Sequence, residues 1–302
     1  MALIAAIHQK PYNRAAPLPE HSLIAPFNRL THGVKGFRDL SGPAEAEYNR
    51  GMDLNFSEAE IQRYSRNILL KELGGTGQAR LKAARVLIIG AGGLGSPVAL
   101  YLAAAGVGCI GLADGDVVEL SNLQRQILHA TDKVGQLKVD SAAAALQRLN
   151  PLVSFRRHAG RVTAENAASL IAEYDLVCDG TDHFPSRFLI ADACAAARRT
   201  LVSAAVLRFE GQISTFKPHE GGPCYRCLYP EPPPEGLVPP CSEAGVLGAV
   251  TGVMGALQAT EAVKELTGIG ASLSGYLLVW DALAAEFRKI RLRKDPACPV
   301  CG

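Results

Sequence analysis

A glycine-rich turn follows the apolar stretch RVLIIG and has the spacing of a phosphate-binding motif. Its glycines occupy the pattern G-x-G-x-x-G at Gly90, Gly92, Gly93 and Gly95. The backbone N–H groups of such a turn, with the positive end of the helix that follows, face a phosphate. Asp114 ends the next apolar stretch, where a carboxylate accepts hydrogen bonds from ribose hydroxyls. The pattern predicts a nucleotide site, but it leaves open ATP, NAD or mere close packing of strand and helix.

Polar residues that follow later apolar stretches separate these possibilities. They are Asn122 and Arg125 in SNLQRQILH, Lys138 in the next helical stretch, and Asp182 directly after DLVCDG. The loops at the carboxyl ends of strands in an open α/β sheet gather around one crevice, so we expect these side chains to converge. Arg and Lys offset the charge of a triphosphate, and a carboxylate holds Mg²⁺. Hydride transfer needs none of these groups, so the set favours ATP.

Four of the eight cysteines form two Cys-x-x-Cys pairs, which are Cys224 with Cys227 and Cys298 with Cys301. Four thiolates suit a tetrahedral structural Zn²⁺, which would tie the C-terminal tail to the main body. Two disulfides, free thiols or a redox pair are the alternatives.

Cys241 stands apart, at the end of a proline-rich loop in PPCSEAGVLG. An exposed thiol next to a helix N-terminus can have a lowered pKa and act as a nucleophile. It can equally be a plain loop thiol, and the sequence leaves both interpretations open.

These candidates require a regular alternation of strands and helices to hold them. The apolar periodicity predicts strands at 85–90, 109–114, 153–158 and 175–180 and helices at 96–108, 134–150, 164–174, 184–198 and 246–268. Pro97 is expected at the first helical position. TLVSAAV and GQISTFK are expected as further strands, the second antiparallel, and YLLVWDAL with EFRKIRL as a hairpin. The fold class is therefore α/β, with a Rossmann-like, doubly wound, mainly parallel sheet and antiparallel additions.

Composition limits the domain organisation and the partners. Residues 1–51 show no sustained period and are expected as an irregular extension, with one domain over residues 52–302. A net charge of +2 without a Lys/Arg block gives no reason to expect nucleic acid. The uncharged stretch 86–113 is broken by glycines and Ser-Pro, so a buried strand–turn–helix is favoured over a membrane span. The low cysteine content and a start without secretory features indicate the cytoplasm.

A series of motifs resembles one enzyme family. GAGGLGS, Asp114, SNLQRQ, GQLKVDSA, CDGTDHFPSR, GQISTF, CYRCL and CPVCG appear in order between Phe56 and Gly302. They are similar to those of the ubiquitin-activating-type adenylyltransferases (MoeB/ThiF/HesA), above all the molybdopterin-synthase adenylyltransferases. The resemblance implies transfer of AMP from ATP to the C-terminal glycine carboxylate of a small ubiquitin-like sulfur-carrier protein, with release of pyrophosphate. The molybdopterin-synthase small subunit is the first expectation for the carrier, and the thiamine-pathway carrier is the alternative.

The resemblance also implies roles for individual residues. Asp114 would hold the ribose, Asn122, Arg125 and Lys138 would contact phosphates, and Asp182 would bind Mg²⁺. Arg66 resembles an arginine that reaches into the neighbouring subunit's site, which implies a homodimer. Cys241 lies where related enzymes form a thioester or acyl persulfide. The nucleotide-contacting set is completed by the four glycines of the turn, with Gly93 against the nucleotide, and by Ser121, Leu123, Gln124 and His183.

Two other functions remain at this point, an NAD-dependent oxidoreductase and a noncatalytic scaffold that binds a ubiquitin-like protein. No rhodanese domain follows the motifs in this sequence, so the sulfur is expected to come from a separate donor.

Overall fold

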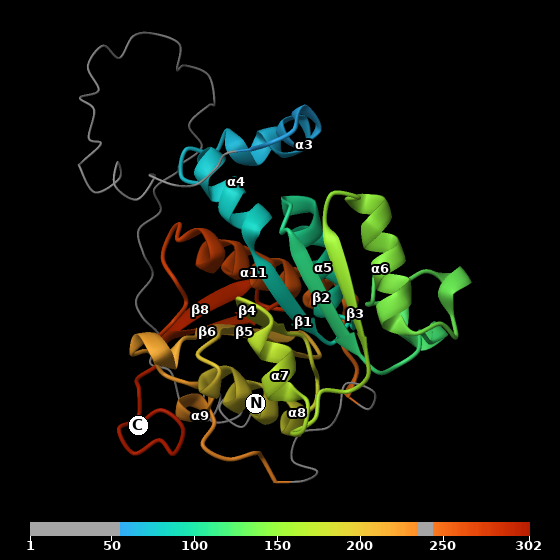
Figure 1. Ribbon diagram of the computed structural model, residues 1–302. Helices are drawn as coiled ribbons and strands as arrows, with labels where there is room; N and C mark the ends of the chain where they lie inside the picture. Colours follow the sequence, from blue (N-terminus) through green and yellow to red (C-terminus); the bar gives the residue numbers. More distant parts are fainter. Residues whose placement is uncertain (1–54, 235–243) are drawn as a thin grey trace, which may run out of the picture. The chain divides into compact units, whose positions relative to one another are not determined.

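The computed structural model describes residues 55–234 and 244–302 (Figure 1). The expected N-terminal extension, residues 1–51, and the candidate nucleophile Cys241 lie outside the described residues. No helix within the two described ranges is long and apolar enough to cross a lipid bilayer.

An eight-stranded sheet has the strand order β3-β2-β1-β4-β5-β6-β7-β8. The first five strands in this order pair in parallel, and β6, β7 and β8 continue the sheet antiparallel. The predicted fold class, including the antiparallel additions and the terminal hairpin, is confirmed. The strands are β1 (Arg85–Ile89), β2 (Cys109–Asp114), β3 (Ser154–Ala159), β4 (Leu176–Asp179), β5 (Thr200–Leu207), β6 (Glu210–Phe216), β7 (Tyr276–Asp281) and β8 (Glu286–Arg291).

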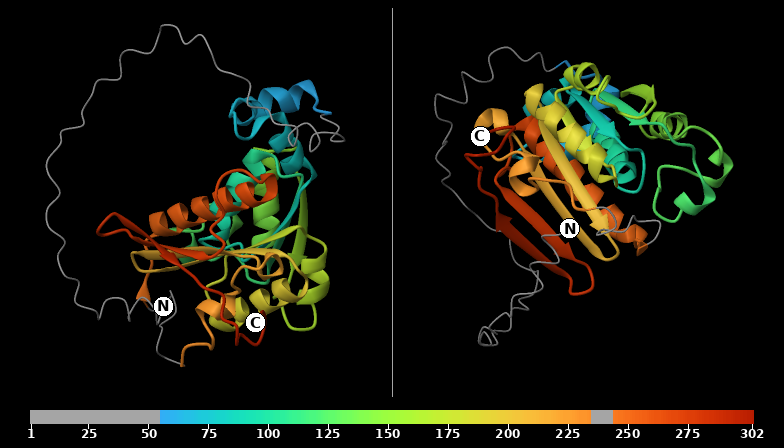
Figure 2. Two further views of the ribbon diagram at one scale, coloured as in Figure 1. Left: turned by 90° about the vertical axis from the view of Figure 1, so that its left-hand side faces the viewer. Right: turned by 90° about the horizontal axis from the view of Figure 1, so that it is seen from below.

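Helices cover both faces of this sheet (Figure 1). In the left view of Figure 2, α11 lies on one side of the strands and α8 on the other. Helices α5 and α6 share the face of α11, and α7 and α9 share that of α8. The helices are α3 (Glu58–Ile68), α4 (Gly74–Ala83), α5 (Gly95–Ala105), α6 (Lys138–Leu149), α7 (Ala167–Ala172), α8 (Phe184–Ala196), α9 (Tyr225–Leu228) and α11 (Gly248–Thr267).

The alternation of side chains along β1 creates a hydrophobic core on each face. Val86 and Ile88 are buried with the apolar residues of α5, α6 and α11. Leu87 and Ile89 are buried with those of α7, α8 and α9. A strand with both faces covered has to be apolar throughout, and this explains the unbroken run RVLIIG.

Two expected helices are much shorter than the sequence suggests, whereas the ends of the other three differ from the expected bounds by at most three residues. The helix expected over 134–150 begins only at Lys138, because Gly135 has a φ of +86° and forms a turn. The helix expected over 164–174 is reduced to α7, since the Asn166 side chain accepts a hydrogen bond from the Thr163 N–H and holds a turn before it. The glycine-rich helix α4 was not expected at all.

The glycine turn joins β1 to α5 with very little space. Gly90 has a φ of +93°, and a Cβ on Gly95 would lie 1.8 Å from the carbonyl oxygen of Gly90. The prediction that Pro97 is the first helical residue is wrong, because α5 begins at Gly95 and Pro97 is its third residue. Its position still costs no hydrogen bond, because the first four N–H groups of a helix have no partner within the helix.

Candidate active site and metal centre

A cavity of about 830 Å³ opens at the carboxyl ends of β1, β2 and β4. Strand order reverses beside β1, and in open α/β sheets ligands bind at such a switch point. The cavity brings together most of the expected site residues, namely Gly90, Gly92, Gly93, Asp114, Asn122, Arg125, Lys138, Asp182 and His183.

Five expected residues do not line this cavity. Gly95 lies beneath the turn, where it serves the close packing of α5. The exposed side chain of Arg66 lies in the last turn of α3. The other three come from the loop before α6 and are Ser121, Leu123 and Gln124.

Asp114 is bound to the glycine turn itself. Its Oδ2 accepts a hydrogen bond from the Ala91 N–H at 2.8 Å, and its Oδ1 accepts one from the Asp116 N–H at 2.8 Å. The carboxylate at the end of β2 therefore fixes the turn after β1. A carboxylate oxygen accepts more than one hydrogen bond, so a ribose hydroxyl remains a possible further donor.

The loop that carries Asn122 and Arg125 is held by its own backbone. The Arg125 Nη1 donates to the Ser121 carbonyl at 3.2 Å, and the Asn122 Oδ1 accepts from the Glu119 N–H at 3.2 Å. Gln126 also lines the cavity, and its buried Oε1 has no hydrogen-bond partner among the described residues. Such a buried acceptor suits a ligand or water that donates a hydrogen bond. The sequence around Gln126 contains no signal that distinguishes this glutamine from its neighbours.

Lys138 is buried and paired with a carboxylate that the sequence analysis missed. Its Nζ lies 3.1 Å from Asp116 Oδ2, and Arg161 Nη2 lies 3.5 Å from the other oxygen of Asp116. Burial alone would raise the pKa of Asp116, but the hydrogen bond and charge of Lys138, helped by Arg161, outweigh it and lower that pKa. The spacing of Asp114 and Asp116 along one strand end was the available signal.

Asp182 is exposed at the cavity, in the loop between β4 and α8. The preceding Thr181 donates its N–H and its hydroxyl to Asp179 Oδ1, at 3.0 Å and 2.7 Å. His183 is the N-cap of α8, so Asp182 stands just ahead of the positive end of that helix. The Asp182 carboxylate and the cations Arg125 and Lys138 therefore line a single cavity.

His129 links three parts of the site from behind. Its Nε2 lies 2.8 Å from the Ala91 carbonyl in the glycine turn, and its Nδ1 lies 2.9 Å from Ser141 Oγ in α6. A carbonyl only accepts, so Nε2 carries the hydrogen and Nδ1 accepts from the serine. Burial lowers the pKa of His129, and Lys138 lowers it further. The ring is therefore neutral and joins the loop before α6, the turn and α6 itself.

The two cysteine pairs converge although they are far apart in sequence. The Sγ of Cys224 lies 3.4 Å from that of Cys298, and the Sγ of Cys227 lies 3.4 Å from that of Cys301. All four sulfur atoms lie within 4.8 Å of one another. These separations are too long for disulfides, whose sulfurs are about 2.05 Å apart. Thiolates around a tetrahedral metal at about 2.3 Å are spaced like this, so the four residues fit Zn²⁺.

The other described cysteines have no such arrangement. Cys178 and Cys194 are buried in the cores on either face of the sheet, where burial raises the pKa of both thiols. Cys109 is partly buried at the start of β2.

Known proteins share both the sequence and the fold. The chain is 56% identical over 247 residues to the protein named adenylyltransferase and sulfurtransferase MOCS3 from Bos taurus, with 82% of this chain and 54% of that protein covered. It thus spans about half the length of that relative. It is 49% identical to the sulfur carrier protein adenylyltransferase of Thermus thermophilus, over 82% of this chain and 93% of the relative.

A solved structure gives the same result for the fold. The crystal structure of E. coli MccB with MccA-N7isoASN has a TM-score of 0.72 and 25% identity, over 83% of this chain and 76% of MccB. The family model described as ThiF family matches residues 64–300. Because this match takes in most of the chain, the protein belongs to the ThiF family.

Proposed function

We propose that the protein is an adenylyltransferase that transfers AMP from ATP to the C-terminal glycine carboxylate of a ubiquitin-like sulfur-carrier protein. One observation carries the proposal: Arg125, Lys138 and Asp182 line the same cavity as the glycine turn. Family membership and the Thermus thermophilus relative, which the chain covers almost completely, support it. A carrier of the molybdopterin-synthase type is the first candidate substrate, and one of the thiamine pathway is the second.

The reaction needs charge neutralisation more than acid–base catalysis. The attacking carboxylate of the carrier is already ionised at neutral pH. The barrier therefore lies in bringing this anion onto the α-phosphate and in stabilising the departing pyrophosphate. Arg125 and Lys138 supply positive charge for both tasks. Lys138 would exchange its carboxylate partner Asp116 for a phosphate oxygen when ATP enters.

Two metals fit the residues present. Asp182 would hold Mg²⁺ beside the phosphates, because it lines the cavity and oxygen ligands suit this ion. Cys224, Cys227, Cys298 and Cys301 would hold a structural Zn²⁺. When bound, Mg²⁺ offsets phosphate charge, and Zn²⁺ fastens the C-terminal tail to α9.

Residues 52–302 would act as one catalytic unit in the cytoplasm and assemble as a homodimer. The exposed position of Arg66, away from the cavity of its own chain, is compatible with a role in the neighbouring subunit.

The central test compares Lys138, the first residue of α6, with Lys133 in the segment just before that helix. Lys138→Gln is expected to lower carrier-dependent ATP–pyrophosphate exchange about a hundredfold or more, the loss that follows removal of one preorganised charge-stabilising group. Lys133→Gln is the matched control, since Lys133 is outside the cavity and pairs with the adjacent Asp132. The assay uses purified carriers of both pathways in separate reactions. Near-normal exchange in a folded Lys138→Gln variant, or no exchange by the unaltered protein with any carrier, would contradict the proposal.

A further inference from the structure

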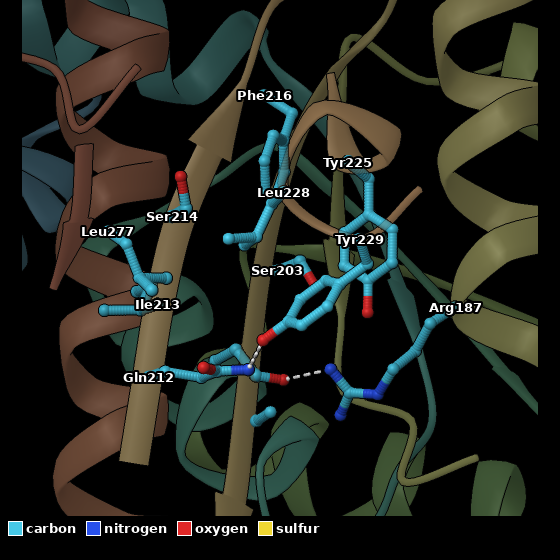
Figure 3. Close-up of a pocket in the computed structure, with 12 residues that line it drawn as sticks. Arg187, Ser203, Gln212, Ile213, Ser214, Phe216, Tyr225, Leu228, Tyr229 and Leu277 are labelled. Carbon is cyan, nitrogen blue, oxygen red and sulfur yellow. Dashed lines mark hydrogen bonds between the residues drawn. The ribbon is translucent and has the colours of Figure 1, made fainter. Parts of the chain in front are cut away.

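A second, much smaller space lies between β5, β6, α8 and α9 (Figure 3). Its volume is about 10 Å³, and Arg187 points into it from α8. Arg187 is buried and is not among the residues that line the large cavity. A buried guanidinium without a place in the proposed chemistry requires a physical explanation, because burying a charge is costly unless it is paired and hydrogen-bonded.

Arg187 is paired with the residues that precede Asp182. Its Nη2 donates to the Thr181 carbonyl, its Nη1 donates to the Ala204 carbonyl at 2.9 Å, and Nη1 lies 3.8 Å from Asp179 Oδ2. Asp179 in turn accepts the N–H and hydroxyl of Thr181, and Ser203 Oγ donates to its other oxygen at 2.9 Å. All three polar groups of Thr181 are thereby fixed. The next residue in the chain is Asp182.

The same guanidinium faces the turn that carries the first cysteine pair. Tyr225 lies between Cys224 and Cys227, and its hydroxyl points toward Arg187 (Figure 3). Its ring packs edge-to-face on Phe188, the residue after Arg187, with ring centroids 5.2 Å apart. The turn that carries the first two cysteines therefore packs against α8 at Phe188, the residue next to Arg187.

A second contact fastens this turn to α8. Arg226 donates from Nε and Nη2 to both carboxylate oxygens of Asp192, at 2.9 Å and 2.8 Å, and its guanidinium lies 4.9 Å from the Phe188 ring centre. A bidentate arginine–carboxylate pair of this kind fixes the relative orientation of the two side chains as well as stabilising their contact. The cysteine cluster thus holds α8 at two places, and α8 begins two residues after Asp182.

We propose that Arg187 is a positioning residue that couples the four-cysteine cluster to the loop carrying Asp182. It holds the Thr181 carbonyl on one side and meets Tyr225 of the cysteine turn on the other. Through this connection the structural centre sets the place of the carboxylate that faces the phosphates. The inference deepens the proposed function and rests on it for the role of Asp182, while the positioning itself is a property of the fold.

The test begins with Arg187→Lys, which keeps the buried charge but cannot reach two carbonyl oxygens at once. Amide hydrogen exchange of residues 181–184 is expected to become about tenfold faster or more, while exchange in β1 is unchanged. The Mg²⁺ concentration for half-maximal ATP–pyrophosphate exchange is expected to rise about tenfold, because a displaced ligand weakens the site. Arg157→Lys is the matched control, since Arg157 is exposed and pairs with Asp140 away from both cavities.

Tyr225→Phe tests the other half of the connection. It removes the hydroxyl that faces Arg187 and leaves the cysteines and the ring packing in place, so faster exchange of residues 181–184 with normal zinc content is expected. Unchanged exchange in Tyr225→Phe would overturn the coupling to the cysteine cluster. Unchanged exchange and an unchanged Mg²⁺ requirement in a folded Arg187→Lys variant would overturn the positioning role.

If Arg187→Lys does not fold, the double variant Asp179→Asn, Arg187→Met replaces it. This pair removes both charges together and leaves no lone buried ion. The same faster exchange of residues 181–184 is expected, and its absence would overturn the proposal. Failure of the proposed function is separate, because it appears as an inactive unaltered protein, whereas the hydrogen-exchange arms need no activity.

Discussion

Lys138 and Asp116 illustrate how single residues prepare the site before a nucleotide arrives. Burying an ammonium group is costly unless its charge is paired and hydrogen-bonded. Asp116 Oδ2 lies 3.1 Å from Lys138 Nζ and pairs with it. Because Asp116 is itself exposed, water can solvate its carboxylate when a phosphate takes its place beside Lys138. The pair therefore stores a cation at the point where negative charge is to be offset.

His129 gives a prediction about pH. Burial lowers the pKa of His129 below the ordinary 6.5 and Lys138 lowers it further, while the hydrogen bond to the Ala91 carbonyl and the charge of Asp114 oppose the shift. Below about pH 6.5 the His129 side chain of the unfolded chain binds a proton, whereas that of the folded chain stays neutral. The contribution of His129 to the free energy of unfolding is therefore fully present above that pH and is lost as the pH falls. His129→Asn is expected to make the fall of unfolding free energy with acid shallower by up to about 1.4 kcal/mol per pH unit.

Urea unfolding at a series of pH values measures this slope. A residual slope is expected in the variant, because burial also lowers the pKa of His158 and of His219. If the unfolding free energy changes equally with pH in the variant and in the unaltered protein, the pKa of His129 is not lowered by folding.

At the scale of elements, the glycine turn predicts a sharp contrast between two glycines. A Cβ at Gly95 would lie 1.8 Å from the carbonyl oxygen and 3.0 Å from the carbonyl carbon of Gly90, and these two backbone atoms cannot move aside. Gly95→Ala is expected to cost about 3 kcal/mol of unfolding free energy or more. Gly75→Ala is the control, since a Cβ there meets nothing within 4 Å inside α4. It is expected to stabilise by about 0.5–1 kcal/mol. Equal urea midpoints for the two variants would refute this account.

The cysteine cluster predicts a link between metal content and stability. Protein purified without a chelator is expected to contain one Zn²⁺ per chain by elemental analysis. Cys298→Ser is expected to lose it and to lower the melting temperature by on the order of 5 °C or more, because metal binding contributes to folding free energy. Cys109→Ser, outside the cluster, is expected to retain the metal. Metal-free protein of unchanged melting temperature would contradict the zinc assignment.

At the scale of the whole molecule, the position of Arg66 predicts an active site shared between two subunits. Arg66→Ala and Lys138→Ala are each expected to abolish carrier-dependent exchange. Mixing and reassembling the two variants is expected to restore about a quarter of the activity, because half of the dimers are mixed and each holds one intact site of two. Mixed dimers that form but stay inactive would place Arg66 in the site of its own chain or outside it.

The sequence by itself determined the features that arise from local patterns. The apolar runs and helical periods predicted the alternation of strands and helices, and loops at the carboxyl ends of parallel strands must share one edge. This was enough to expect the nucleotide residues in one cavity and to recognise the family. The glycines of the turn between β1 and α5 indicated a nucleotide site because a strand, a tight turn and a helix follow one another there within a few residues.

Only the tertiary structure decided which side chains bind one another across the sheet. The pairing of Lys138 with Asp116, the bridge of His129 to the Ala91 carbonyl and the burial of Arg187 beside Asp179 all join separate elements. Such contacts depend on the register of strands and the seating of helices to within an ångström, and residue spacing does not fix these. The meeting of the four cysteines was predicted from their two Cys-x-x-Cys pairs, whose chemistry is specific, and it is confirmed by sulfur atoms that lie within 4.8 Å of one another.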